Sequence, residues 1–224
     1  MKLDFKLKLL DRIYQLYDNV LASHRLACRK FCSDCCTRNV GLTTLEGYLI
    51  VRHLTLNDQM ALLGQLKKDL PLPRFEPRIT TNQIAQLCAD GKDIPQEEIE
   101  IEPGRCPFLE DDLCRIYMVR PFGCRCLVSG KKCAETGWAD VDDFLLSVAT
   151  VFLQYIEHMD RKGRSGNLTD VLLWMESGRN RRAYEKGDLP ENGLVENQPI
   201  RFLFVPPEHR DRMRPILNAL QSIS

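Results

Sequence analysis

Apolar residues spaced three or four positions apart recur along most of the chain and predict helices. In the first run, over residues 3–30, Leu3, Leu7, Leu10 and Ile13 begin one apolar face. We expect an amphipathic helix there that runs straight into the first cysteines. The same spacing predicts further helices from about residue 44, then over 58–68, 81–89, 140–158, 168–177 and about 208–223.

Local start and stop signals refine these helices. Thr43 precedes Glu46 by three residues, which is the spacing of a capping box and predicts a helix start near residue 44. The prolines of "PLPRFEP", residues 71–77, should end the next helix because proline lacks the amide donor and clashes with a preceding turn. We expect "RNRR", residues 179–182, to be a solvated turn, and Pro215 to start or kink the last helix.

The helical spacing disappears between residues 90 and 134, where proline, glycine and cysteine dominate. "CPFLEDDLCRIY" predicts a small hairpin with an acidic turn, and "RPFGCRC" an irregular knuckle. The sequence therefore predicts a mainly α fold, one helical domain over residues 1–224 around a cysteine-rich irregular insert. The cysteine region covers about 24–135, and a helical carboxy-terminal part about 136–224.

Charge and hydropathy narrow the classes of partner. Lys plus Arg equal Asp plus Glu at 31 each, so nothing in the net charge favours a nucleic acid or an anionic membrane as partner. The first residues lack the apolar core of a signal peptide, and no window has about 18 consecutive apolar residues. We expect a cytoplasmic protein with a protein or redox partner.

Thiols stay reduced in the cytoplasm, so the ten cysteines are better interpreted as metal ligands than as disulfides.

The first cysteines lie in "CRKFCSDCC", residues 28–36. Cys28 and Cys32 are four residues apart at the expected helix end, so their sulfurs should converge on one side of it. Cys35 completes a C-x2-C pair with Cys32, a spacing that lets two thiolates reach one metal ion. Adjacent Cys35 and Cys36 cannot easily point the same way, so one of them should bind a first site while the other reaches a second site or packs.

The later cysteines are more widely spaced, which suits ligands delivered from hairpin ends and loops. With the first group they make nine thiols, enough for two four-sulfur sites or for one site with spare thiols. The isolated Cys88 is expected in the core. His24, four residues before Cys28, is a candidate ligand or proton donor, although a surface histidine is the more usual case. The later group comprises Cys106, Cys114, Cys124, Cys126 and Cys133.

The two motifs together resemble one known family. "CRKFCSDCC", then "VGLTTLEG" and "CPFLEDDLCRIYMVRPFGCRC", are similar to the YkgJ-like cysteine-cluster family, described as a zinc- or iron-chelating domain. The resemblance covers about residues 5–135. It implies that Arg120 and Arg125 offset cluster charge as cofactor-binding residues. Cys126 stands where the family often has an aromatic or aliphatic residue. The implied metal ligands are Cys28, Cys32, Cys35, Cys36, Cys106, Cys114, Cys124 and Cys133.

Several functions fit this ligand set. Thiolates select zinc, copper(I) or iron–sulfur, and the irregular spacing favours an iron–sulfur cluster narrowly over zinc, in a redox-related metal-binding protein. Some family members are similar to flagellin lysine N-methylases, which makes a protein lysine N-methylase using S-adenosylmethionine the alternative, although no G-x-G-x-x-G turn is present. The C-x3-C-x2-C spacing also occurs in radical-SAM enzymes. However, Asp34 occupies the aromatic position of that motif, and alternating strand–helix units are absent.

Overall fold

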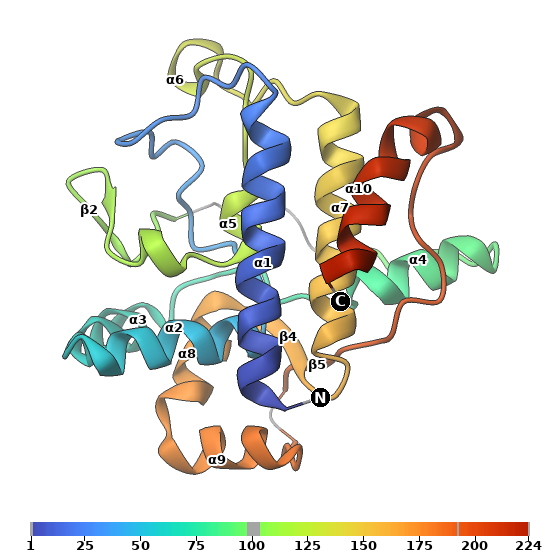
Figure 1. The fold of residues 1–224 in the computed structure, drawn as a ribbon. Coiled ribbons are helices and arrows are strands. Elements are labelled where there is room, and N and C mark those ends of the chain that lie inside the picture. Colours follow the sequence, from blue (N-terminus) through green and yellow to red (C-terminus); the bar gives the residue numbers. More distant parts are fainter. Residues whose placement is uncertain (1, 98–103, 192, 224) are drawn as a thin grey trace.

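The computed structural model describes residues 2–97, 104–191 and 193–223, and within these ranges the fold is mainly α, as predicted. Ten α-helices of the described chain surround two small antiparallel sheets (Figure 1). Residues 98–103 of the irregular stretch lie outside the described residues.

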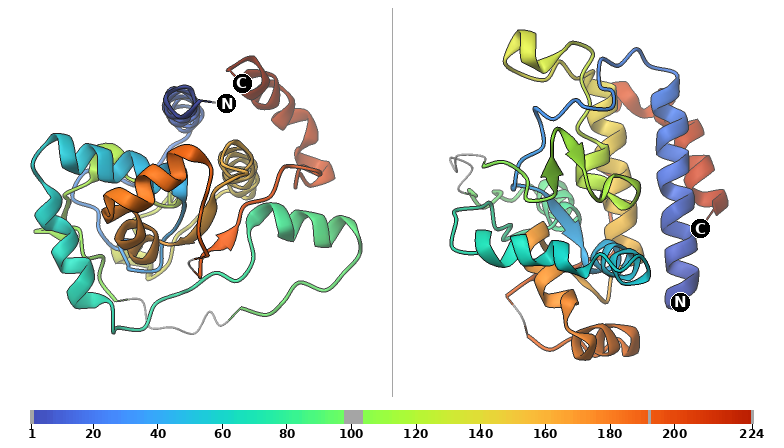
Figure 2. Two further views of the ribbon diagram at one scale, coloured as in Figure 1. Left: turned by 90° about the horizontal axis from the view of Figure 1, so that it is seen from below. Right: turned by 90° about the vertical axis from the view of Figure 1, so that its left-hand side faces the viewer.

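Three long helices form one side of the molecule. α1 (Leu3–Ala22) lies beside α7 (Asp143–Met159) and α10 (Arg210–Ile223), as both views of Figure 2 show. Tyr17 of α1 is fully buried, and its ring meets the ring of Phe152 edge-on with 5.1 Å between centroids. The apolar spacing in the sequence therefore forms the shared core of these helices.

A second group of helices packs below them in Figure 1. α2 (Thr44–Leu56) runs against α8 (Leu168–Glu176), with α3 (Leu63–Asp69) and α9 (Gly178–Lys186) alongside. The predicted capping box is confirmed. The Thr43 hydroxyl accepts the backbone amide of Glu46, and the Glu46 carboxylate accepts the backbone amide of Thr43.

The central sheet was not predicted. Its strands β1 (Gly41–Thr43), β4 (Arg164–Asn167) and β5 (Val195–Glu196) are too short to show an alternating pattern, and they pair in the order β1-β4-β5. Leu42 faces Gly166 across the first antiparallel pair. This pairing ties the segment after the first cysteines to the carboxy-terminal half of the chain.

The predicted hairpin is confirmed. β2 (Leu109–Glu110) pairs with β3 (Leu113–Cys114) in an antiparallel register. The turn residues Asp111 and Asp112 have φ values of 48° and 60°, a left-handed conformation that aspartate tolerates better than most residues. Cys114 therefore lies at the end of the returning strand, paired with Leu109.

Two predictions about helices were wrong, and one of the two alternatives for Pro215 is excluded. α1 ends at Ala22, not at residue 30, because the positions beyond it carry few apolar residues that reach the core. The "RNRR" stretch belongs to α9 rather than to a turn; its one buried side chain, Tyr184, anchors that helix. Pro215 lies inside α10 and does not start it. The remaining elements are η1 (Met60–Leu62), α4 (Thr81–Ala89), η2 (Tyr117–Val119), α5 (Phe122–Arg125), α6 (Cys133–Thr136) and η3 (Pro207–His209).

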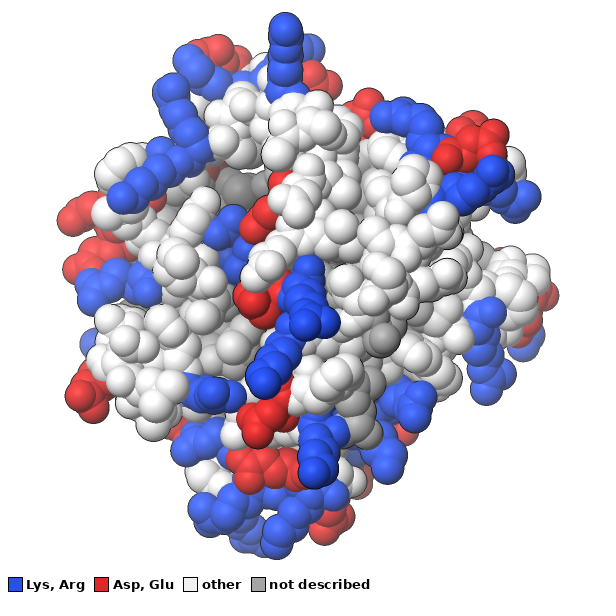
Figure 3. Space-filling model, in the orientation of Figure 1, with Lys and Arg blue, Asp and Glu red and all other residues white. Residues whose placement is uncertain are grey.

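Charge is distributed without a dominant sign over the face shown in Figure 3, where lysine and arginine alternate with aspartate and glutamate. Among the described helices, none combines the length and the apolar character that crossing a membrane would require.

Candidate functional site

The cysteine-bearing loops gather on one side of the molecule, beside the carboxy-terminal half of α1, with α6 above them (Figure 1). Short backbone contacts hold them together: the Cys106 amide donates to the Cys36 carbonyl at 2.9 Å, beside an isolated bridge between Thr37 and Arg105. The Ala27 amide donates to the Ser129 carbonyl at 2.8 Å. The two distant cysteine groups of the sequence are thus brought to one place by folding.

One set of thiols, which we term the outer cluster, consists of Cys28, Cys32, Cys35 and Cys133. Cys28 is exposed. Partial burial raises the pKa of Cys28, and negative charge on each of the other three thiols would raise it further. Cys28 is therefore close enough to each of the other three thiols to interact electrostatically, although 98 positions separate Cys35 from Cys133.

A second set, the inner cluster, consists of Cys36, Cys106, Cys114 and Cys124. A hydrogen bond from the Cys35 thiol lowers the pKa of Cys36. Burial and negative charge on the other three inner thiols act in the opposite direction and raise it. Burial raises the pKa of Cys106 to about 11. Burial also raises the pKa of Cys124, and negative charge on Cys106 and Cys114 raises that pKa further. Each of these four thiols therefore lies close enough to other members of the set for their charges to affect one another.

Two inner thiols receive backbone hydrogen bonds. The amide of Phe108 opposes the rise in the pKa of Cys106, and the amide of Ile116 does the same for Cys114. In each case the donor lies two residues after the cysteine. An amide that donates to sulfur stabilises the thiolate, the form that binds metal, so this local backbone suits metal ligation.

Cys35 and Cys36 are the junction of the two clusters. They are adjacent in sequence but belong to different sets, and their thiols share a hydrogen bond. The helical convergence expected for Cys28 and Cys32 is wrong, because α1 ends at Ala22 and both residues lie in the following loop. What brings Cys28 and Cys32 together is the loop conformation instead.

Two further cysteines stand apart from the clusters. Burial raises the pKa of Cys126 to about 12, with smaller contributions from the charges of Glu46 and Cys35, and the charge of Cys126 in turn raises the pKa of Cys124. The buried hydroxyl of Tyr17, whose pKa Cys126 also influences, has no hydrogen-bond partner among the described residues. Cys88 is exposed on α4 rather than in the core, contrary to the prediction.

The two arginines have different environments. Arg120 lies over the Tyr117 ring at 3.8 Å, donates to the Tyr117 carbonyl at 3.0 Å, and its charge lowers the pKa of Cys114. Arg125 donates to the Arg120 carbonyl at 3.1 Å and lies over the Tyr14 ring at 4.2 Å. Arg120 thus acts electrostatically on the inner cluster, whereas the contacts of Arg125 brace the loop against α1.

Glu46 is the residue that sequence reasoning missed. Besides capping α2, its buried carboxylate accepts the Phe122 amide and the Tyr14 hydroxyl, each at 2.7 Å. Phe122 begins α5, which carries Cys124, so Glu46 connects the core to the inner cluster. The capping-box spacing identified Glu46 as a helix cap. The contacts of Glu46 with Tyr14 and Phe122 join distant parts of the chain, so no local sequence pattern predicts them.

The donor chemistry of the clusters fits a thiophilic metal, since each contains four cysteines and all ten cysteines of the chain are free thiols. Within the described ranges, however, no group of three or more His, Cys, Asp or Glu side chains lies in an arrangement that could hold a metal ion. His24 instead bonds the Val20 carbonyl at 3.0 Å, at the end of α1. Comparisons of the chain with family models, curated proteins and solved structures find no match.

Proposed function

We propose that this protein binds metal through the outer and inner clusters, as an iron–sulfur or zinc protein with a redox-related role. The observation that carries the proposal is the division of eight cysteines, from segments about 70 residues apart, into two sets of four interacting thiols. Four thiolates are a complete ligand set for a zinc ion or for an iron–sulfur cluster. Isolated buried cysteines do not usually collect in this way.

The surroundings of the inner cluster support the same proposal. The Phe108 and Ile116 amides would donate to ligand sulfurs, and the positive charge of Arg120 would offset part of the negative charge of a thiolate-rich centre. The resemblance of the motifs to the YkgJ-like family points in the same direction.

The metal itself would supply either a structural crosslink or one-electron redox chemistry. Zinc does not change oxidation state, so it would serve the first purpose; an iron–sulfur cluster would serve the second. The chain's own contribution is to hold the sulfurs, provide amide donors and limit solvent access. The irregular spacing favours iron–sulfur narrowly, and metal analysis distinguishes the two.

The test is the iron, zinc and acid-labile sulfide content of protein purified without oxygen. Cys114→Ser and Cys133→Ser each remove one ligand from a different cluster, so each should lose about half of the metal of the wild type, since each site needs its full ligand set. Cys88→Ser is the matched control, because this thiol is exposed and belongs to neither cluster, and it should retain all the metal.

The form of the metal follows from the same samples. Iron with equal sulfide and a brown colour would identify iron–sulfur, and colourless protein with zinc would identify zinc. A metal-free wild type would contradict the proposal, and so would a loss in Cys88→Ser as large as in Cys114→Ser.

A further inference from the structure

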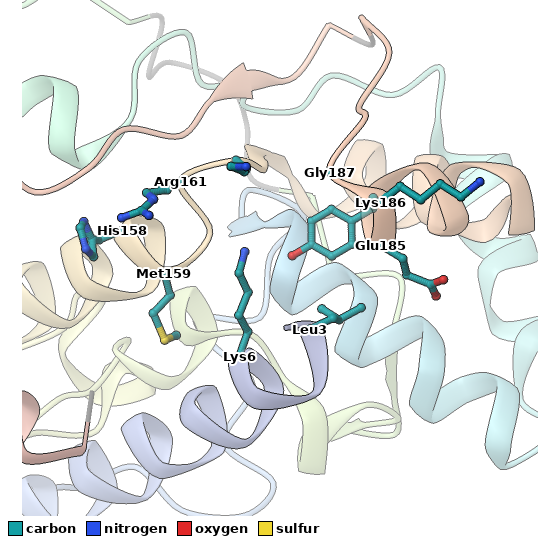
Figure 4. Close-up of a pocket in the computed structure, with 10 residues that line it drawn as sticks. Leu3, Lys6, His158, Met159, Arg161, Glu185, Lys186 and Gly187 are labelled. Carbon is teal, nitrogen blue, oxygen red and sulfur yellow. The ribbon is translucent and has the colours of Figure 1, made fainter. Parts of the chain in front are cut away.

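A cavity of about 200 Å³ lies at the end of α1 opposite to the cysteine loops. It is formed where α1 begins, where α7 ends and where α9 ends, with Leu3, Met159 and Tyr184 in its wall (Figure 4). None of the residues that line the cavity is a cysteine, and eight residues of α1, about 12 Å at 1.5 Å per residue, separate Lys6 from Tyr14, the α1 residue whose pKa the charge of Cys124 raises. The cavity is therefore a separate feature from both clusters.

The cavity is lined by more positive than negative charge. Lys6, Arg161, Lys162 and Lys186 contribute four cations, and Glu185 contributes one carboxylate. The chain as a whole has no net charge, so this excess is local. Figure 4 shows Lys6 extending from α1 towards the middle of the cavity, while Glu185 and Lys186 point outwards.

Helix ends account for only some of these cations. Arg161 and Lys162 follow the last turn of α7, where positive charge is favourable. Lys6, by contrast, lies in the first turn of α1, where the helix dipole disfavours a cation. Lys6 is held there by buried Asp160, with 3.5 Å between ammonium and carboxylate.

Buried Asp160 connects two residues of the cavity wall, Lys6 and Tyr184. Its carboxylate also accepts the hydroxyls of Tyr184 at 2.7 Å and Thr44 at 2.6 Å, and its carbonyl accepts the Gly163 amide at 2.6 Å. That last bond closes the turn that carries Arg161 and Lys162. The ammonium of Lys6 has three N–H donors, so it can keep its pairing with Asp160 and still donate into the cavity.

We infer that this cavity binds a small molecule carrying a phosphate group. At about 200 Å³, the cavity has room for a phosphate with a short organic part. Lys6, Arg161 and Lys162 supply donors from two elements, and phosphate prefers such charge-assisted bonds. In the part of the chain that the structure describes, neither Arg161 nor Lys162 has a carboxylate ion-pair partner, so both are free to accept an anion.

The test is a titration of ¹⁵N-labelled full-length protein with inorganic phosphate and with glycerol 3-phosphate, in about 150 mM sodium chloride so that weak surface attraction is screened. Saturable shifts should appear in the amides of Arg161–Gly163 and of Lys186 and Gly187. Tighter binding of glycerol 3-phosphate would identify an organic phosphate as ligand, and tighter binding of inorganic phosphate would identify the free ion.

Two double variants distinguish a site from general charge. Arg161→Gln/Lys162→Gln should weaken phosphate binding by about tenfold or more, because two charge-assisted donors are lost. Lys8→Gln/Arg182→Gln removes the same charge from exposed positions of α1 and α9 outside the cavity, and should bind phosphate as the wild type does.

The absence of saturable shifts would overturn the inference, and so would equal weakening in both double variants. If Arg161→Gln/Lys162→Gln lowers the melting temperature and the wild type shows no binding, the two cations only stabilise the end of α7. The result does not depend on metal content, so it stands or falls separately from the proposed function.

Discussion

Replacing Glu46 with glutamine should destabilise the protein far more than a single lost hydrogen bond would. The carboxylate is 2% exposed and accepts four hydrogen bonds, from the Tyr14 hydroxyl, the Phe122 amide, and the Thr43 amide and hydroxyl. A carboxylate only accepts, which matches four converging donors. Glutamine keeps one accepting oxygen and adds an NH2 group that must face one pair of these donors.

The magnitude follows from which donor loses its acceptor. If the NH2 group faces Tyr14 and Phe122, the hydroxyl can rotate and accept, but the Phe122 amide cannot. If it faces Thr43, the Thr43 amide is left unpaired. An unpaired buried donor costs about 1–3 kcal/mol, and the loss of charge assistance weakens the remaining bonds, so we expect a total of about 2–4 kcal/mol.

The assay is urea unfolding of reduced, metal-free protein, followed by circular dichroism at the helix band. Tyr14→Phe is the matched control, because it removes one donor and leaves both amides paired; it should cost about 1 kcal/mol. A Glu46→Gln variant within about 0.5 kcal/mol of the wild type, or no worse than Tyr14→Phe, would refute the interpretation of Glu46 as the link between α1, α2 and α5.

Gly47→Ala should cost about 1–3 kcal/mol in urea unfolding, because the new Cβ would lie 2.5 Å from a methyl of Val171, whereas Gly64→Ala, with nothing within 4 Å, should stabilise by about 0.5–1 kcal/mol. His158 accepts the Ile200 amide through Nδ1, and burial lowers its pKa, so the unfolded chain takes up the proton first and stability should fall as pH drops below about 6.5. His158→Asn keeps an acceptor there and should lose that part of the pH dependence; an unchanged profile would count against it. If the proposed function holds, a chelator should remove metal from the outer cluster faster than from the inner one, because Cys28 is exposed; one uniform release rate would contradict this.

Much of the helical framework was predictable because its signals are local. The predicted capping residue Thr43 fulfils its role, and the range predicted for α4 agrees with Thr81–Ala89. The central sheet was not predictable, since β1 and β4 have only three and four residues and pair across more than 120 positions. Strands that short show no period, and their pairing depends on tertiary packing.

α9 shows a different limit of sequence reasoning. "RNRR" is polar on nearly every side, so no apolar stripe marks it as a helix. Its one buried residue is Tyr184, whose hydroxyl reaches buried Asp160, and Glu185 accepts the Tyr48 hydroxyl. Such tertiary contacts outweigh local propensity there, and one buried residue cannot produce a detectable period.

The cysteines show why ligand types were easier to predict than ligand sets. Their number and crowding mark them in the sequence, but membership of a cluster depends on backbone contacts such as the Cys106 amide on the Cys36 carbonyl. That bond places Cys36 with the later cysteines, while its neighbour Cys35 faces the outer thiols. Spacing within "CRKFCSDCC" favours grouping Cys28, Cys32 and Cys35, which the fold keeps together, but it carries no information on the fourth member. Cys133 follows a segment that meets the first cysteine loop where the Ala27 amide donates to the Ser129 carbonyl, a contact between two loops that share no sequence pattern.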